Sequence, residues 1–330
     1  MRIRLVIFIS LNVLKGNDNM IKILRWSENR FIPSDKIERH CLINVISPTK
    51  NELEKLSAEI HIPSDFLTDP LDIDERSRVE IEDGVLLIVL RLPKYEQTNS
   101  EIPFKTIPAG IILTKDDTIV IISSSDIIGV LDLYNVKTKG IITGKRSSFI
   151  LQIFLKTAQL YLKYLKEINR LTDEIETELQ KSMKNEELIR LLNIEKSLVF
   201  FATSLKSNEL MMERLLKTEL LKLTLSDKDI LEDVLIDNRQ AIEMANIYSN
   251  ILSGMMDAFA SIISNNLNVV MKILTSITII LMIPTLTASI YGMNIKLPYQ
   301  QSPHAFFSVI GISFILSLLS ILIFIWKKWF

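Results

Sequence analysis

Two long, uncharged, apolar runs stand near the end of the chain. The first occupies residues 273–291 and reads ILTSITIILMIPTLTASIY; the second occupies residues 305–326 and reads AFFSVIGISFILSLLSILIFIW. Because an α-helix rises about 1.5 Å per residue, helices of 19 and 22 residues both cover the roughly 30 Å hydrocarbon layer of a bilayer. A helix buried in a soluble core normally keeps a polar face. The pattern therefore predicts two membrane-spanning helices rather than a buried soluble hairpin.

The spacing of apolar residues is helical from about residue 147 to the first apolar run. We expect helices over residues 147–183 and 185–217, with Glu and Lys on their outer faces. A third helix is expected to begin at Ser226, where Ser-Asp-Lys-Asp is a capping signal. Because no proline follows until Pro284, this helix is predicted to continue unbroken into the membrane, over a length on the order of 100 Å.

The chain before residue 136 alternates between strand and helix patterns. Strands are predicted at 42–45, 84–92, 106–113 and 118–123, and MIKILRW from Met20 is also strand-like. Helices are predicted for KNELEKLSAEI and after Pro63. These elements predict an α/β domain with a mixed sheet covered by helices.

Residues 1–19 have the basic start and the short apolar run of a signal peptide. They contain no small-residue cleavage site, so we favour a misplaced start codon or an extra edge strand as the explanation of this segment.

These patterns predict an α/β N-terminal cytosolic domain, then a long α-helical stalk, then two C-terminal transmembrane helices. The expected boundaries are an uncertain extension at 1–19, the α/β domain at 20–146, the helical region at 147–272, a first transmembrane segment at 273–293, an extracellular loop at 294–304, a second transmembrane segment at 305–326 and a basic tail at 327–330.

Charged residues are unevenly distributed between these parts. The chain has 38 basic and 39 acidic residues; no acidic residue follows Lys272, whereas Lys296, Lys327 and Lys328 do. The part up to Lys272 therefore has 35 basic and 39 acidic residues and a net charge of −4. Because lysines flank the outer ends of the two-span segment, the positive-inside rule places both termini in the cytoplasm. The single cysteine, Cys41, agrees with a reducing compartment.

The residue inventory excludes the common enzyme classes. The chain has three histidines and one cysteine, and it contains no HExxH, CxxC or GxSxG motif. Gly140 and Gly144-Lys145 resemble a phosphate loop, but the spacing is one residue short and Arg146 stands where Ser or Thr is needed. We therefore expect no enzyme activity and no bound nucleotide. The basic cluster at 137–146 is interpreted as a solvated loop, since a net acidic soluble part does not suit nucleic-acid binding.

One face of the third helix is small or polar over about a dozen turns, where a dimeric coiled coil would show Leu and Ile. Its members are Asn250, Gly254, Asp257, Ser261, Ser264, Asn268, Met271, Thr275, Thr278, Met282, Thr285, Ser289 and Gly292. Within a membrane such a stripe either joins two helices or lines water. Continuity from the soluble part through the bilayer favours a pore, and because one helix cannot enclose a pore, a cyclic homo-oligomer is required.

The stripe ends at Tyr291-Gly292-Met293-Asn294, and here the sequence resembles the CorA family of magnesium channels and transporters. Their signature is a Gly-Met-Asn triplet that closes the first of two C-terminal membrane helices, commonly with a tyrosine before it. The resemblance implies a funnel-shaped homopentamer with five first helices around the pore and Tyr291–Asn294 as the selectivity filter. The residues expected to line or gate the pore are Asn268, Met271, Leu274, Thr275, Thr278, Met282, Thr285 and Ser289.

The chemistry of the filter suits an ion that keeps its water. Mg²⁺ takes octahedral oxygen ligands and dehydrates reluctantly, so neutral oxygens suit its passage better than carboxylates do. Gly292 lets backbone carbonyls approach the axis of the expected pore. Asn294 can offer its side-chain carbonyl to the water molecules that Mg²⁺ carries. Met271, Leu274 and Met282 are expected to form an apolar constriction that gates by dewetting.

Regulation by Mg²⁺ on the cytosolic side is implied by the same resemblance. Family members close when cytosolic Mg²⁺ binds between subunits, one acid lying on the stalk and another on the neighbouring α/β domain. By position, Asp257 matches the first acid and Asp69 the second. Because Thr68 stands where the family often has a further acid, a second regulatory site is left open.

The sequence thus predicts a homopentameric channel in the cell membrane for influx of hydrated Mg²⁺, gated closed by cytosolic Mg²⁺. The loop after the triplet, IKLPYQQSPH, lacks the acidic residues that often attract cations in this family. The ion therefore stays open, and a Co²⁺, Ni²⁺ or Zn²⁺ transporter of the same architecture is the alternative. From another class, a membrane-anchored helical scaffold or sensor that conducts nothing would also fit.

Overall fold

The structure is a computed structural model with two compact units, Met1–Ser253 and Gly254–Phe330. It describes residues 20–27, 30–34, 37, 41–96, 101–131, 146–182, 185–218, 220–221, 223–295, 303–327 and 329. Most of the basic cluster at 137–146, most of the loop at 294–304 and the whole expected N-terminal extension lie outside these residues.

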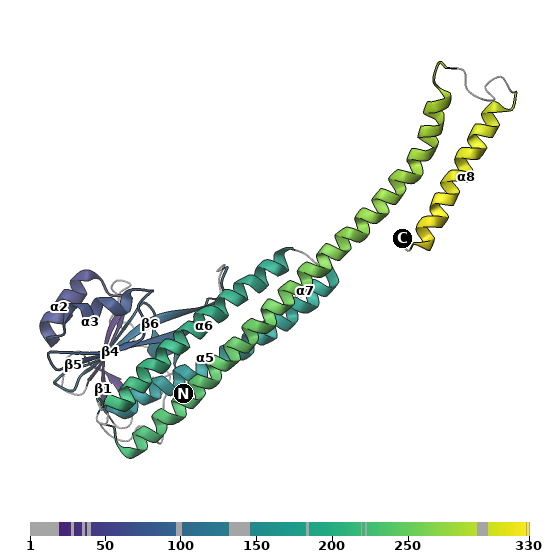
Figure 1. The fold of residues 1–330 in the computed structure, drawn as a ribbon. Helices are drawn as coiled ribbons and strands as arrows, with labels where there is room; N and C mark the ends of the chain where they lie inside the picture. Colours follow the sequence, from purple (N-terminus) through teal and green to yellow (C-terminus); the bar gives the residue numbers. More distant parts are fainter. Residues whose placement is uncertain are drawn as a thin grey trace, which may run out of the picture. The chain divides into compact units, whose positions relative to one another are not determined.

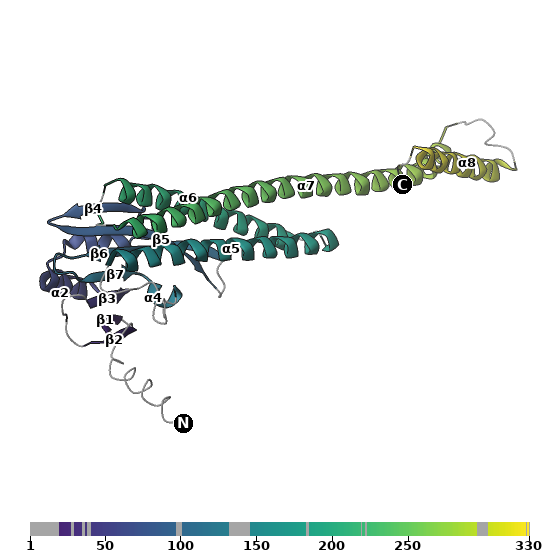
Figure 2. The same ribbon diagram turned by 90° about the horizontal axis from the view of Figure 1, so that it is seen from below.

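A mixed seven-stranded sheet forms the centre of the first unit (Figures 1 and 2). Its strands follow the order β2 (Arg30–Pro33), β1 (Met20–Ser27), β3 (Cys41–Ile46), β7 (Ile119–Ser123), β6 (Phe104–Leu113), β5 (Val85–Tyr95) and β4 (Arg78–Glu82). Only the β3–β7 pair within this sheet is parallel. The four predicted strands and the strand-like MIKILRW segment are confirmed, as is the mixed sheet. Strands β2 and β4 were not predicted, because both are short and carry charged residues.

Alternating side chains of the sheet enter two separate cores. Leu87 and Val89 of β5 pack with α2 (Lys50–Ile60) and α3 (Ser64–Thr68), whereas Leu86 and Ile88 of the same strand pack with the long helices on the other face. This alternation follows from the period of two along a strand, and a strand buried on both faces reads as a continuous apolar run. Helix α2 begins with the capping box of Thr49 and Glu52, and the short α4 (Ile127–Val130) follows β7.

Three long helices follow the sheet: α5 (Arg146–Ser182), α6 (Asn185–Thr218) and α7 (Leu225–Tyr291). The predicted bounds of α5 and α6 are correct to within one residue. The start of α7 differs from the prediction, because Thr224 and not Ser226 caps the helix. The Thr224 backbone N–H and hydroxyl both donate to Asp227 Oδ2, at 3.0 and 2.8 Å. Ser226 lies inside the first turn.

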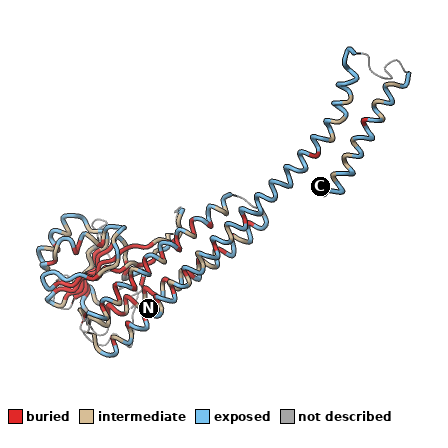
Figure 3. Tube along the Cα trace, in the orientation of Figure 1, coloured by how far each residue is buried: buried red, intermediate tan, exposed pale blue. Residues whose placement is uncertain are grey.

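The second unit contains the end of α7 and the whole of α8 (Ala305–Trp326), whose bounds match the predicted span. Pro284 lies inside α7 without ending it. Both helices contain an apolar window long enough to cross a membrane, and only 6% of each window is buried. Figure 3 shows this exposure along both helices. Because a hairpin in a soluble core would be covered, the exposure favours two membrane spans over that alternative.

Candidate ion pathway

One side of α7 in the second unit is less exposed than the rest. Ser276 is buried, and Ile280, Ile283 and Thr287 are half-buried, while the other residues of 271–291 are exposed. These four positions repeat at i, i+4, i+7 and i+11, which is one face of a helix. Helix α8 lies beside this part of α7 (Figure 1), and its own buried residue is Ser313. Small hydroxyl residues are typical of contacts between membrane helices.

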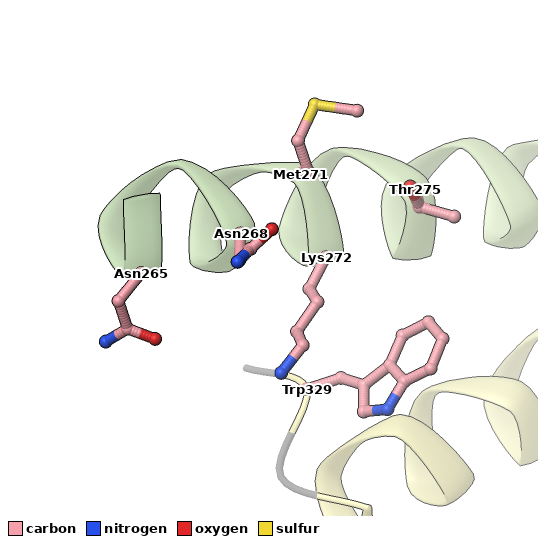
Figure 4. Close-up of a pocket in the computed structure, with 6 residues that line it drawn as sticks. All are labelled: Asn265, Asn268, Met271, Lys272, Thr275 and Trp329. Atoms are coloured by element: carbon pink, nitrogen blue, oxygen red, sulfur yellow. The ribbon is translucent and has the colours of Figure 1, made fainter. Parts of the chain in front are cut away.

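The predicted pore-lining residues lie away from this covered side. The exposed set comprises Asn268, Met271, Leu274, Thr275, Thr278, Met282, Thr285 and Ser289. None of them coincides with the four less exposed positions. Within one chain the stripe is therefore exposed, although Asn268, Met271 and Thr275 at its start line a pocket with Trp329 (Figure 4). Whether the stripe lines a pore stays a prediction.

Two threonines of the stripe have their hydroxyl protons already engaged. Thr278 Oγ1 donates to the carbonyl oxygen of Leu274 at 2.9 Å, and Thr285 Oγ1 donates to that of Leu281 at 3.0 Å. A hydroxyl has one proton and two lone pairs, so each oxygen is left as an acceptor toward its exposed side. Oxygen acceptors without charge can bind the water shell of a cation.

The predicted filter stands where α7 ends. The Gly292 N–H donates to Ala288 O at 2.9 Å, and the Met293 N–H donates to Ile290 O at 3.2 Å, so the helical pattern tightens and stops at this triplet. A Cβ atom at residue 292 would lie 3.2 Å from Ala288 O, which is tighter than ordinary contact. Glycine therefore allows this close turn. Tyr291, Met293 and Asn294 are exposed.

Asp69 is held in an ion pair within the first unit. It begins the short 3₁₀ helix η1 (Asp69–Leu71), and its Oδ2 lies 2.7 Å from Arg78 Nη2. Arg78 also pairs with Glu75 and, at 3.0 Å, with Glu80. Burial disfavours the charged guanidinium, but the hydrogen bonds to Asp69 and Glu80 outweigh it and raise the pKa of Arg78. A divalent cation at Asp69 must therefore compete with a permanent internal cation.

Asp257 differs from Asp69 in its surroundings. It lies on α7 in the second unit and is exposed, and its carboxylate makes no ion pair with any residue that the structure describes. Its backbone carbonyl accepts a hydrogen bond from Ser261 Oγ at 2.9 Å. Among the described residues there is no group of three or more His, Cys, Asp or Glu side chains that could hold a metal ion. A regulatory ion at Asp69 or Asp257 would thus need water or another subunit for its remaining ligands.

Sequence reasoning missed the arginine that fixes the acidic segment after Asp69. Arg91 of β5 donates from Nη1 to the carbonyl oxygens of Ile73 and Glu75, at 3.0 and 2.6 Å, and from Nη2 to Thr106 Oγ1 at 3.0 Å. The available signal was a single charge inside the apolar strand VLLIVLRL. A half-buried guanidinium still needs several acceptors, and the backbone of this segment supplies two of them.

Comparison with known proteins covers almost the whole chain. A family described as "CorA-like Mg2+ transporter protein" matches residues 38–328. The cobalt/magnesium transport protein CorA of Methanocaldococcus jannaschii is 30% identical over 292 residues, which are 87% of this chain and 90% of that protein. The protein of the same name from Thermotoga maritima is 25% identical, over 80% of this chain and 75% of that one. The complete structure of the M. jannaschii magnesium transporter superposes with a TM-score of 0.80 at 28% identity, over 94% of this chain and 99% of that chain.

Proposed function

This chain belongs to the CorA-like Mg²⁺ transporter family, and we propose that it mediates influx of hydrated Mg²⁺ across the cell membrane. Its relatives are named as transport proteins, which supports a transporter rather than an enzyme. Two apolar helices long enough to span a bilayer support a place in the membrane. We place the N- and C-termini in the cytoplasm, because Lys272, Lys327 and Lys328 flank the spans on that side.

The observation that carries the proposal is the open stripe of α7. It is uncharged from Met271 to Asn294, it offers hydroxyl acceptors at Thr278 and Thr285, and α8 of the same chain leaves it exposed. A single helix cannot enclose a pore, so α7 helices from several copies of the chain must surround a common axis. We assign this assembly to a homopentamer, on the resemblance to the family.

The route suits a doubly charged ion that retains its water. Stripping Mg²⁺ would demand close carboxylates, and the pathway has none between Met271 and Asn294. Amide and backbone oxygens at Gly292–Asn294 can instead bind the hydration shell at the outer end. Met271, Leu274 and Met282 form the apolar constriction, where loss of water closes the path. The membrane potential supplies about 2.3 kcal/mol per elementary charge per 100 mV, without a nucleotide.

Closure by cytosolic Mg²⁺ is assigned to Asp69 and Asp257. Each carboxylate presents too few ligands within one chain, so an ion at either residue is shared with another subunit or with water. Bound Mg²⁺ would neutralise facing negative charge and hold subunits together, and its loss would let them separate. The pairing of Asp69 with Arg78 sets how easily that residue accepts the ion.

The transported ion is the least constrained part of the proposal. Relatives are named for cobalt as well as magnesium transport, and neutral oxygens discriminate weakly between divalent ions of similar size. Transport of Co²⁺, Ni²⁺ or Zn²⁺ is therefore the second candidate. A membrane-anchored scaffold that conducts nothing is the alternative from another class.

Ion uptake into proteoliposomes tests the proposal. Purified full-length protein is reconstituted, and uptake of Mg²⁺, Co²⁺, Ni²⁺ and Zn²⁺ is followed in parallel with an internal indicator. We expect Mg²⁺ uptake that Asn294→Ala abolishes, while Asn169→Ala on the exposed surface of α5 leaves it unchanged. Uptake that survives Asn294→Ala, or no uptake of any of the four ions, would contradict the proposal. Preference for another ion would support the second candidate.

A further inference from the structure

The segment at residues 69–77, which begins with Asp69 and is called the Asp69 segment below, is hydrogen-bonded to helix α6. The Ser77 backbone N–H donates to Ser207 Oγ at 3.0 Å, and the Ser77 hydroxyl donates to Asn208 Oδ1 at 2.6 Å. Asn208 is buried, so the second bond is shielded from water at the α6 end. Because a shielded hydrogen bond constrains both partners, the end of the Asp69 segment is fixed to α6.

The Asn208 amide also replaces a missing strand partner of β5. Strand β4 begins at Arg78, opposite Val89 of β5, and therefore does not extend as far as Arg91. Asn208 Oδ1 accepts from the Arg91 N–H at 3.0 Å, and Asn208 Nδ2 donates to the Arg91 carbonyl oxygen at 2.8 Å. One side chain thus satisfies two backbone groups that need partners. Since the Arg91 guanidinium binds two carbonyl oxygens of the Asp69 segment, Asn208 holds that segment both directly and through Arg91.

The neighbouring face of the same turn of α6 is bonded to α7. Asn238 Nδ2 donates to the Leu205 carbonyl oxygen at 3.0 Å, and Arg239 Nε lies 2.6 Å from Glu209 Oε1. Asn238 and Glu209 are both buried. Successive residues of an α-helix are about 100° apart, so Asn208 and Glu209 contact different neighbours from one helical turn. This turn of α6 is therefore bonded to the Asp69 segment on one face and to α7 on the next.

We infer that Asn208 and Asn238 are positioning residues through which the Asp69 segment and helix α7 move together. A Mg²⁺ ion at Asp69 displaces the Arg78 guanidinium and so changes the contacts of the segment. Hydrogen-bond networks with packed side chains carry such changes between elements. Because α7 continues as one helix to Tyr291, a shift at Asn238 acts on the helix that bears the proposed pore face.

The inference rests on the proposed sensing role of Asp69 and specifies how occupancy of that residue reaches α7 within one subunit. A purely structural role for these hydrogen bonds would change the stability of the first unit but not the response of α7 to Mg²⁺. The response to the ion is therefore the quantity to measure.

Amide hydrogen exchange of the detergent-solubilised full-length protein, with and without Mg²⁺, measures this response. Mass spectrometry follows exchange in the Asp69 segment, in residues 200–213 of α6 and in residues 231–244 of α7. In wild type we expect Mg²⁺ to slow exchange several-fold in all three. The double variant Ser77→Ala, Ser207→Ala removes two hydrogen bonds between the segment and α6. It should keep the effect of Mg²⁺ in the Asp69 segment and lose it in both helices.

A second variant breaks the connection at its other end. Asn238→Leu keeps the size of the side chain and removes the donor to the Leu205 carbonyl oxygen. We expect it to keep the effect of Mg²⁺ in the Asp69 segment and in residues 200–213, and to lose it in residues 231–244. The two variants thus predict different patterns, which a general loss of stability would not produce.

Two further variants serve as controls. Ser77→Thr restores the hydroxyl at this position, so paired with wild-type Ser207 it should behave as wild type does. Ser57→Ala removes a comparable hydrogen bond, from Ser57 Oγ to the Ile62 carbonyl oxygen at 2.7 Å, on α2 at the opposite face of the sheet. It should leave the effect of Mg²⁺ unchanged in all three regions.

Several outcomes would overturn the inference. They are a wild-type effect of Mg²⁺ that is absent from the Asp69 segment, one that is absent from residues 231–244, and an effect in residues 231–244 that persists in both the double variant and Asn238→Leu. Ion uptake into proteoliposomes is measured separately. The expected exchange patterns without uptake of any divalent ion would leave the inference standing and contradict the proposed transport, whereas uptake without an effect of Mg²⁺ on α7 would do the reverse.

Discussion

Arg78 Nη2 lies 2.7 Å from Asp69 Oδ2, so the carboxylate that we assign to Mg²⁺ sensing is already paired with a cation of its own chain. Both side chains are about one-third exposed, at 31% and 34%. Ion pairs this exposed contribute about 0–1 kcal/mol, which a bound divalent ion can replace. If Asp69 binds Mg²⁺ as proposed, the pair would set a threshold, because the ion would have to displace the guanidinium before it could occupy the carboxylate.

Removal of the guanidinium should sensitise the protein to cytosolic Mg²⁺. In Arg78→Gln, Asp69 loses its competing partner, so inhibition of uptake should occur at an internal Mg²⁺ concentration up to about fivefold lower, in line with a pair worth up to ~1 kcal/mol. The measurement is Mg²⁺ influx into proteoliposomes preloaded with graded Mg²⁺. Arg170→Gln removes an exposed arginine that pairs with Glu167 and Glu174 on α5, and it serves as the control. An unchanged or higher inhibitory concentration in Arg78→Gln would contradict the assignment of Asp69.

Reversal of charge at Asp257 should have the opposite effect. An ammonium at this exposed position of α7 repels Mg²⁺, so Asp257→Lys should need a several-fold higher internal Mg²⁺ concentration for closure. The same preloaded vesicles give the inhibition curve. Asp229→Lys makes the same change at another exposed position of α7, in the first unit, and should leave the curve in place. Coincident curves for wild type and Asp257→Lys would remove Asp257 from the gating proposal.

Two threonines of α7 provide a matched test of the pore face. Both Thr285 and Thr287 donate their hydroxyl to the carbonyl oxygen four residues earlier, at 3.0 and 2.8 Å, but Thr285 lies on the open stripe and Thr287 on the side that α8 covers. Valine keeps the shape and removes the acceptor oxygen. We expect Thr285→Val to slow Mg²⁺ influx several-fold, because a hydrogen bond contributes about 0.5–1.5 kcal/mol. Thr287→Val should have little effect on influx, and equal effects of the two variants would argue against a pore on this face.

The carboxylate of Asp227 should stabilise the first unit in a pH-dependent way. Asp227 is buried, which raises the pKa of the carboxyl, but hydrogen bonds from Thr224, Ser148 and Ser147 outweigh burial and lower that pKa below 3.8. Because the folded-state pKa is depressed, the contribution is fully present above the unfolded-state value of about 4 and is lost as the pH falls through the folded-state pKa.

Thermal unfolding of Asp227→Asn measures this contribution. At pH 7 the variant should unfold several degrees below wild type, in keeping with ~2 kcal/mol for hydrogen bonds to a charged group. The difference should shrink as the pH is lowered below about 4. Asp229→Asn removes an exposed charge two residues away and should show neither effect. A pH-independent difference for Asp227→Asn would mean that shape rather than charge is responsible.

The sequence was most informative where the spacing of apolar residues alone determines the type of element. The α8 bounds were predicted to the residue because a charge-free run ends at Trp326 and basic residues follow it. The β5 and β6 strands were recognisable because burial on both faces makes them continuously apolar. By contrast, β4 (RVEIE) carries charges on an edge strand, and only its pairing with β5 reveals it.

The site was less predictable than the fold, because it depends on contacts between distant residues. Nothing in FLTDPLDIDE indicates that Asp69 will meet Arg78; that contact requires the turn whose carbonyls bind Arg91. Helix α7 carries serine and threonine on several sides. The sequence pattern already placed Thr285 in the stripe and left Ser276 out of it, and the structure adds that Ser276 is buried whereas Thr285 is exposed.

The absence of acidic residues beyond Asp257 has a consequence for protons. Histidine occurs there only at position 304, and the other ionisable side chains there are lysines and tyrosines. From Asn268 to Asn294 the proposed pathway therefore contains no carboxylate and no histidine. Acidification of the cytoplasm should leave the charge along this route unchanged, so that the cation gradient and the membrane voltage set the rate of uptake.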